Sequence, residues 1–249
     1  MTGDMTRNLR ICFIGDSFTQ GVGDPEFRGW VGRVMAAAWA DLVGSAAGGV
    51  GSAGGVGVVG GGAGAEEGGG ARSADVTVFN LGVRRNTSAD VLARCWTETG
   101  VRALPGADNR LVLSVGANDT TIEDGRPRVE PEQCLANVAD LLDGARERGF
   151  AALVVGPPPV ADGGEERLAR QLELSEGIAA LCGARGVSFV DVTRALAEDP
   201  LWVAEALAGD GAHPGAGGYG RLAELVLRGG FREWLADGRV RHAAAAGRA

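Results

Sequence analysis

Five short apolar segments, separated by stretches with helical spacing, restrict the fold of this chain more than any other feature. The apolar segments cover residues 9–14, 75–81, 109–115, 151–155 and 187–192. Apolar residues recur at helical spacing in 29–43, 88–98, 131–148, 165–182 and 219–235, with a short helical piece at 202–207. Strands that alternate with helices form a parallel sheet covered on both faces. The predicted fold class is therefore α/β, with five parallel strands.

Local signals refine the helices and the domain organisation. Ser88 is a candidate N-cap, and Pro131 suits a first helical turn. No internal repeat or second core is evident, so we predict a single domain over residues 1–238. Residues 45–72 are almost entirely Gly and Ala and should form a flexible insertion. A phosphate-loop interpretation of that stretch is disfavoured because it lacks a P-loop lysine. Residues 239–249 should form a frayed tail.

Charge and cysteine usage limit the classes of partner. The net charge of −8 disfavours nucleic acid and anionic membranes. No apolar run approaches membrane-spanning length, and the polar N-terminus does not resemble a signal peptide, so we expect a cytoplasmic protein without stable membrane association. The four cysteines lack metal-ligand spacing, which favours reduced thiols, no metal site and no disulfide framework. The oligomeric state is left open.

Three of the predicted strands end in polar turns. The turns read GDS at 15–17, NLG at 80–82 and GAND at 116–119. Turns at the carboxyl ends of parallel strands meet at one edge of a sheet, where open α/β folds bind ligands. Ser17 is therefore a candidate nucleophile, provided that a base lies beside it.

Two residues far downstream offer that base and its partner. The sequence contains only two histidines, and His242 lies in the Ala-rich tail. His213 follows Asp210 by three residues, a spacing that lets the carboxylate orient the imidazole and stabilise the imidazolium. The alternative is a loop aspartate that caps a turn beside a surface histidine.

Acyl transfer also needs hydrogen-bond donors for the developing oxyanion. The candidates are the backbone N–H groups of Ser17 and Gly82 and the side-chain amide of Asn118. Alternatively, Gly82 supplies a turn with positive φ, and Asn118 forms an Asx-turn.

The combination of these blocks resembles the SGNH hydrolase superfamily, also called GDSL esterases and lipases. GDSFTQG is similar to the first block, with its nucleophile at Ser17, and NLGV to the second, with Gly82 as an oxyanion donor. GAND is similar to the third, with Asn118 as another donor, and DGAHP to the last, with Asp210 and His213 completing the triad. The resemblance implies a three-layer, flavodoxin-like α/β/α sandwich, a serine hydrolase mechanism and no cofactor.

The sequence departs from the family pattern in two places. One lies between the first and second blocks, and the other lies within the second block. The insertion 45–72 has no counterpart in the minimal pattern and acts either as a lid or as tolerated length. Arg85 stands where the second block usually continues with glycine. Its side chain either brings a cation to the acyl pocket or points to solvent.

The leading hypothesis is a serine esterase that cleaves small or short-chain esters through an acyl-enzyme. Thioester hydrolysis and acyl transfer on the same triad are neighbouring alternatives. A non-catalytic binding module that retains the fold is an alternative from another class. A nucleotide-binding flavodoxin-like protein would rest on fold analogy and glycine content alone.

Overall fold

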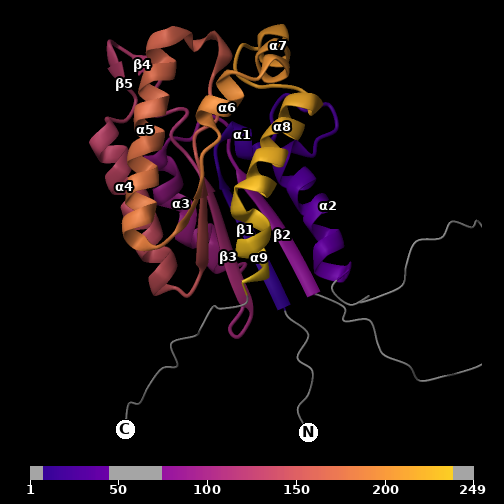
Figure 1. The fold of residues 1–249 in the computed structure, drawn as a ribbon. Helices are drawn as coiled ribbons and strands as arrows, with labels where there is room; N and C mark the ends of the chain where they lie inside the picture. The colour runs from indigo at the N-terminus through magenta and orange to yellow at the C-terminus, as the bar shows by residue number, and fades with distance from the viewer. Residues whose placement is uncertain (1–7, 45–74, 238–249) are drawn as a thin grey trace, which may run out of the picture.

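The computed structural model describes residues 8–44 and 75–237, and a five-stranded parallel sheet forms the centre of this part (Figure 1). The strands lie in the order β2-β1-β3-β6-β7. Their bounds are Asn8–Gly15 for β1, Asp75–Gly82 for β2, Asp108–Ser114 for β3, Ala151–Val155 for β6 and Ser188–Val190 for β7. Gly15 pairs with both Gly82 and Ser114, so three polar turns begin at one level of the sheet.

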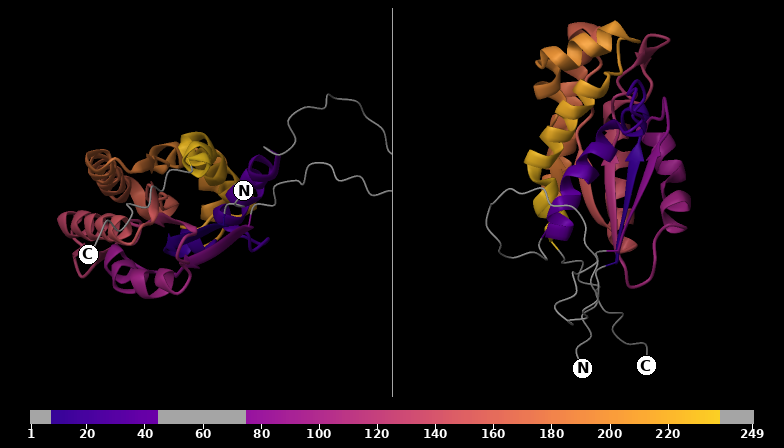
Figure 2. Two further views of the ribbon diagram at one scale, coloured as in Figure 1. Left: turned by 90° about the horizontal axis from the view of Figure 1, so that it is seen from below. Right: turned by 90° about the vertical axis from the view of Figure 1, so that its right-hand side faces the viewer.

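Helices cover both faces of the sheet, and Figure 2 shows the resulting three layers. One layer contains α2 (Gly29–Gly44), α8 (Ala216–Val226) and α9 (Arg232–Ala236), and the other contains α3 (Ser88–Gly100), α4 (Pro131–Glu147) and α5 (Gly164–Arg185). Alternate residues of β1 supply the two cores, since side chains of a strand alternate between its faces. Ile11 and Phe13 pack with the first layer, and Cys12 and Ile14 with the second. The predicted α/β/α sandwich is confirmed.

Several short elements were not predicted, because they lack the length needed to show a period. They are α1 (Ser17–Gln20), β4 (Ile122–Glu123), β5 (Arg126–Pro127), η1 (Ala161–Gly163) and α6 (Thr193–Ala197). Figure 1 shows α1, α6, α7 (Pro200–Ala208) and the β4–β5 hairpin at one end of the molecule. Asp124 and Gly125 both have positive φ, as a two-residue type I′ hairpin turn requires.

Two local predictions were wrong. The stretch 219–235 is not one helix: α8 ends at Val226, a π-helical turn η2 (Leu227–Phe231) follows, and Gly230 has φ 106°. A Cβ on Gly229 would lie 2.4 Å from Val190 Cγ1, so close contact with β7 requires glycine there. The N-cap of α3 is Thr87 rather than Ser88, because Thr87 and Asp90 form a reciprocal capping box.

The predictions for the insertion 45–72, the tail 239–249 and His242 lie outside the described residues. Within residues 8–44 and 75–237, no helix combines the length and apolar character needed to cross a membrane.

Candidate active site

The end of β1 places Ser17 at the first position of α1. A Cβ on Gly15 would lie 2.2 Å from the Ser114 carbonyl oxygen and 2.3 Å from Thr19 Oγ1, so only glycine fits between β3 and α1. Asp16 then caps α1 by accepting a hydrogen bond of 2.9 Å from the Phe18 amide. The chain thus passes from strand to helix within two residues, and this turn presents Ser17 at the carboxyl edge of the sheet.

Ser17, His213 and Asp210 form one hydrogen-bonded row. His213 Nε2 lies 2.7 Å from Ser17 Oγ, and His213 Nδ1 lies 2.8 Å from Asp210 Oδ2. Asp210 Oδ1 accepts hydrogen bonds from the His213 amide at 2.9 Å and the Ala212 amide at 3.2 Å. The structure therefore brings together residues that are separated by up to 196 positions in the chain.

The carboxyl of Asp210 is held in its ionised form. Burial opposes ionisation, but hydrogen bonds from the amides of His213 and Ala212 and from the imidazole outweigh it and lower the pKa of Asp210 to about 2. Asp210 therefore remains an acceptor over the whole range in which a histidine changes its protonation state.

Packing keeps the imidazole in place from two sides. The ring of Phe18 lies 5.0 Å from the imidazole of His213, measured between centroids. On another side, a Cβ on Gly23 would lie 3.1 Å from His213 Cβ and 2.9 Å from the Pro214 carbonyl oxygen. Tyr219 Oη donates to the Val22 carbonyl at 2.7 Å and ties α8 to the same loop. The His213 side chain is 8% exposed, so the imidazole is almost fully enclosed by these contacts.

Gly82 ends β2, and Asn118 lies in the turn that follows β3; these two strands flank β1. A Cβ on Gly82 would lie 2.1 Å from the Gln20 amide nitrogen, so glycine is required by the approach of α1 and not by a positive φ. The Gly82 N–H donates to Asn80 Oδ1 at 3.0 Å. Asn118 Nδ2 donates to the Asn86 carbonyl at 3.0 Å and contacts Asp16 Oδ2 at 3.4 Å. The amide is thus directed toward the Asp16–Ser17 turn.

Arg94 of α3 is a site-supporting residue that the sequence did not indicate. Its Nη2 donates to the carbonyl of Gly15 at 2.8 Å and to that of Leu81 at 2.9 Å, and its Nε donates to Asn86 Oδ1 at 2.7 Å. One guanidinium therefore joins the ends of β1 and β2 to the loop that accepts the Asn118 amide. An arginine inside an amphipathic helix gives no sequence signal of such a role.

The two arginines after Gly82 point to different partners. Arg85 has φ +70°, the left-handed conformation that glycine adopts without strain, and its guanidinium lies 3.3 Å from Glu123 of β4. Arg84 extends the other way, and its Nη2 lies 3.1 Å from Asp210 Oδ2. The backbone therefore retains a glycine-like conformation at 85, and the cation beside the row of Ser17, His213 and Asp210 is Arg84.

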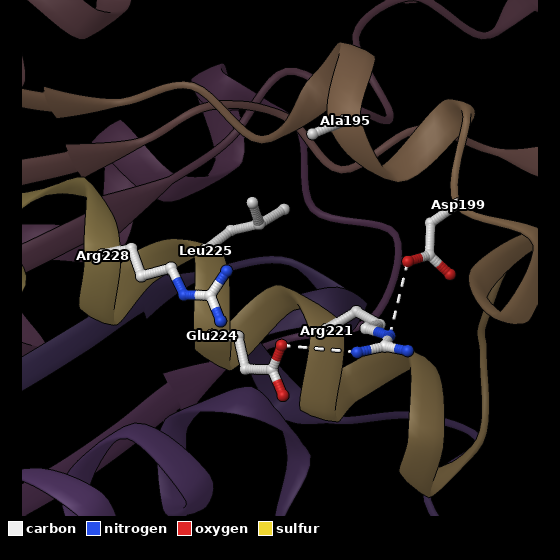
Figure 3. A pocket seen from close by; sticks show the side chains of 6 residues that line it. All are labelled: Ala195, Asp199, Arg221, Glu224, Leu225 and Arg228. Atoms are coloured by element: carbon white, nitrogen blue, oxygen red, sulfur yellow. Dashed lines mark hydrogen bonds and ion pairs between the residues drawn. The ribbon is translucent and has the colours of Figure 1, made fainter.

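Two pockets lie apart from this row. Figure 3 shows one of them, where Arg221 of α8 pairs with Asp199 and Glu224, both at 3.4 Å. The other lies among the β4–β5 hairpin, α4 and α5, and its lining includes Val129, Leu135 and Leu174. Neither contains a predicted site residue. No group of three or more His, Cys, Asp or Glu side chains within the described ranges could hold a metal ion.

The sheet order and the helical layers match the α/β/α fold of SGNH hydrolases. The chain belongs to the GDSL-like lipase/acylhydrolase family, whose profile matches residues 13–221. It is therefore an esterase or acylhydrolase that acts on ester bonds, and the predicted family and reaction class are confirmed.

Solved structures share the fold at low sequence identity. A lipase/acylhydrolase from Enterococcus faecalis is 21% identical, with 88% of this chain and 94% of that chain covered and a TM-score of 0.61. Axe2, an acetylxylan esterase from Geobacillus stearothermophilus, is 19% identical, with 92% and 98% covered and a TM-score of 0.62. No curated protein sequence matches the chain significantly.

Proposed function

We propose that the protein is a serine esterase for small or short-chain acyl groups, with Ser17 as nucleophile. The observation that carries the proposal is the continuous row from Ser17 Oγ through His213 to Asp210, with distances of 2.7 and 2.8 Å. A neutral imidazole at hydrogen-bond distance is what a serine hydroxyl needs to become nucleophilic.

In this mechanism Ser17 Oγ attacks the ester carbonyl while His213 Nε2 accepts its proton. Asp210 keeps the Nδ1 proton in place and stabilises the imidazolium, which then protonates the leaving alcohol. In the second half-reaction His213 Nε2 takes a proton from water as the water oxygen attacks the acyl carbonyl. The imidazolium then gives that proton to Ser17 Oγ as the acyl–oxygen bond breaks and the carboxylic acid leaves. No cofactor is needed for either half-reaction.

The proposed oxyanion donors are the amides of Ser17 and Gly82 and the side chain of Asn118. Ser17 opens α1, and the first amides of a helix lack partners within it. In the structure the Gly82 amide donates to Asn80 Oδ1 and the Asn118 side chain donates to the Asn86 carbonyl. Both donors would have to exchange these acceptors for the developing oxyanion. Each such donor is worth on the order of 3 kcal/mol in the transition state.

Turnover of p-nitrophenyl acetate tests the assignment. The purified protein should hydrolyse this ester and react with a fluorophosphonate probe, and Ser17→Ala should lose both properties. Undiminished turnover by Ser17→Ala would exclude the serine mechanism. A folded wild-type protein that neither hydrolyses esters nor reacts with the probe would favour a non-catalytic binding module.

The acyl and leaving groups are to be found by comparing kcat/KM over a chain-length series of esters and thioesters. We include acetylated xylooligosaccharides because Axe2 is described as an acetylxylan esterase. A higher rate with thioesters, or acyl transfer to an added alcohol, would select one of the neighbouring activities. Location in the cytoplasm without stable membrane association is part of the proposal, and cell fractionation tests it.

A further inference from the structure

The carboxylate of Asp210 accepts four hydrogen bonds. Two come from backbone amides of its own loop, one from the imidazole of His213 and one from Arg84. Asp210 Oδ1 accepts from the two backbone amides, and Asp210 Oδ2 lies 2.8 Å from His213 Nδ1. The same Oδ2 also accepts from Arg84 Nη2 at 3.1 Å. The imidazole and the guanidinium therefore share one oxygen of Asp210.

The Arg84 side chain is 57% exposed, but the backbone from which it extends is anchored. Its backbone N–H donates to Gln20 Oε1 at 3.1 Å, and Gln20 is the last residue of the helix that begins with Ser17. Arg84 also follows Gly82 by two residues. Arg84 thus connects the end of β2 with α1 and with the loop that carries Asp210.

We propose that Arg84 is a positioning residue whose guanidinium shares Oδ2 of Asp210 with the imidazole and so disfavours the protonated form of His213. The inference rests on the proposed function and adds to it a determinant of the pH range. A carboxylate that is partly neutralised by a cation stabilises an imidazolium less, and the cation itself repels the imidazolium. Arg84 would therefore keep His213 available as a base at lower pH.

Other charged groups also face this loop. Asp16 directly precedes Ser17, and Asp162 of η1 lies against Gly211. Glu205 of α7 accepts hydrogen bonds from the amides of Gly217 and Gly218. Asp24 and Arg33 act at longer range on neighbouring Tyr219. These groups are common to the wild type and to a variant at position 84, so a difference between the two profiles reports on Arg84.

Arg84→Gln tests the proposal, and Arg85→Gln is the matched control. The acid limb of kcat/KM for p-nitrophenyl acetate should move to higher pH by about half a unit in Arg84→Gln, the size typical of an exposed charge pair. Arg85→Gln should retain the wild-type profile because its guanidinium faces Glu123. In about 1 M salt, where the Debye length is about 3 Å, the difference between Arg84→Gln and the wild type should shrink.

Two further measurements separate charge from structure. Arg84→Lys should restore most of the wild-type profile, because it retains the positive charge. Proton NMR titration should give the same shift for the imidazole of His213, with the signal of His242, the only other histidine, assigned by a His242→Gln variant. This titration needs no turnover, so it tests Arg84 even if the ester assay fails.

The proposal is overturned if Arg84→Gln leaves the acid limb and the His213 titration unchanged or moves them to lower pH. An equal shift in Arg85→Gln would also overturn it, since the effect would then belong to the general charge of the loop. Failure of the proposed function has a different signature, which is esterase activity that survives Ser17→Ala.

Discussion

Asp16 is a buried carboxyl directly before the proposed nucleophile. Its side chain is fully buried, and burial together with nearby Asp119 raises the pKa of Asp16 to about 7 despite the hydrogen bond from the Phe18 amide. The neutral form is thus favoured in the folded state. Its contribution to stability is complete below the unfolded value of 3.8 and is lost as the pH rises through about 7.

Asp16→Asn should flatten this part of the stability profile. The amide retains an oxygen to cap α1 but does not ionise, so the variant should gain roughly 3 kcal/mol relative to the wild type between about pH 4 and about pH 7. Urea unfolding at several pH values measures the difference. A constant difference between the two proteins over this range would contradict the expectation.

Arg85 adopts a conformation that suits glycine, so Arg85→Gly should be well tolerated. Removing the left-handed strain gains about 1 kcal/mol, while loss of the exposed pair with Glu123 and the greater freedom of the unfolded chain each cost up to about 1 kcal/mol. The unfolding free energy should therefore stay within about 1 kcal/mol of the wild type, and kcat within about twofold. A large loss of kcat would show that the Arg85 side chain takes part in the reaction.

At the scale of elements, Arg94 connects α3 to the ends of β1 and β2. Arg94→Met should lower kcat about tenfold with less change in KM, because displaced oxyanion donors act mainly in the transition state. The unfolding free energy should fall by about 1–3 kcal/mol through the loss of hydrogen bonds to buried carbonyls. Steady-state kinetics and urea unfolding measure the two effects.

Glu98→Gln is the control for Arg94. It removes the ion pair of 3.0 Å between Glu98 and Arg94 but leaves the contacts of the guanidinium with the Gly15 and Leu81 carbonyls. Its kcat should stay near the wild-type value. A similar loss of kcat in both variants would indicate that α3 as a whole, and not the carbonyl contacts, supports the site.

At the scale of the whole molecule, all four thiols belong to the core between the sheet and one helical layer. Cys12, Cys95, Cys134 and Cys182 are free and buried in one cluster that joins β1 to α3, α4 and α5. Burial raises the pKa of each thiol, to about 11 for Cys12 and Cys182 and to about 12 for Cys95. Thiolate is therefore scarce at neutral pH.

Native protein should accordingly resist a thiol reagent such as DTNB near pH 8, and all four thiols should react once urea unfolds the chain. Labelling should proceed as one slow phase, since one cluster must open to expose them. Esterase activity should survive incubation with the reagent. Rapid labelling of a single thiol in the native state would contradict the burial of all four.

Periodicity and motif order were sufficient to predict the five strands, the covering helices and the family. Apolar spacing reflects burial directly, and glycine after an apolar run marks the end of a strand. The short elements, such as α1 and the β4–β5 hairpin, were missed because so few residues cannot show a period. The break at Gly230 was missed because it depends on a tertiary contact, the close approach of β7 to the helix at Gly229. The catalytic roles of Ser17, His213 and Asp210 stay predictions until the variants are measured.

By itself the sequence determined which residue types stand at the strand ends, because strand periods and glycine turns are local properties. Only the tertiary structure decided which of the two arginines after Gly82 meets Asp210, a residue 126 positions away from Arg84. This contact depends on how the turn after β2 packs against α1 and the loop that carries Asp210. No local pattern in the sequence encodes it.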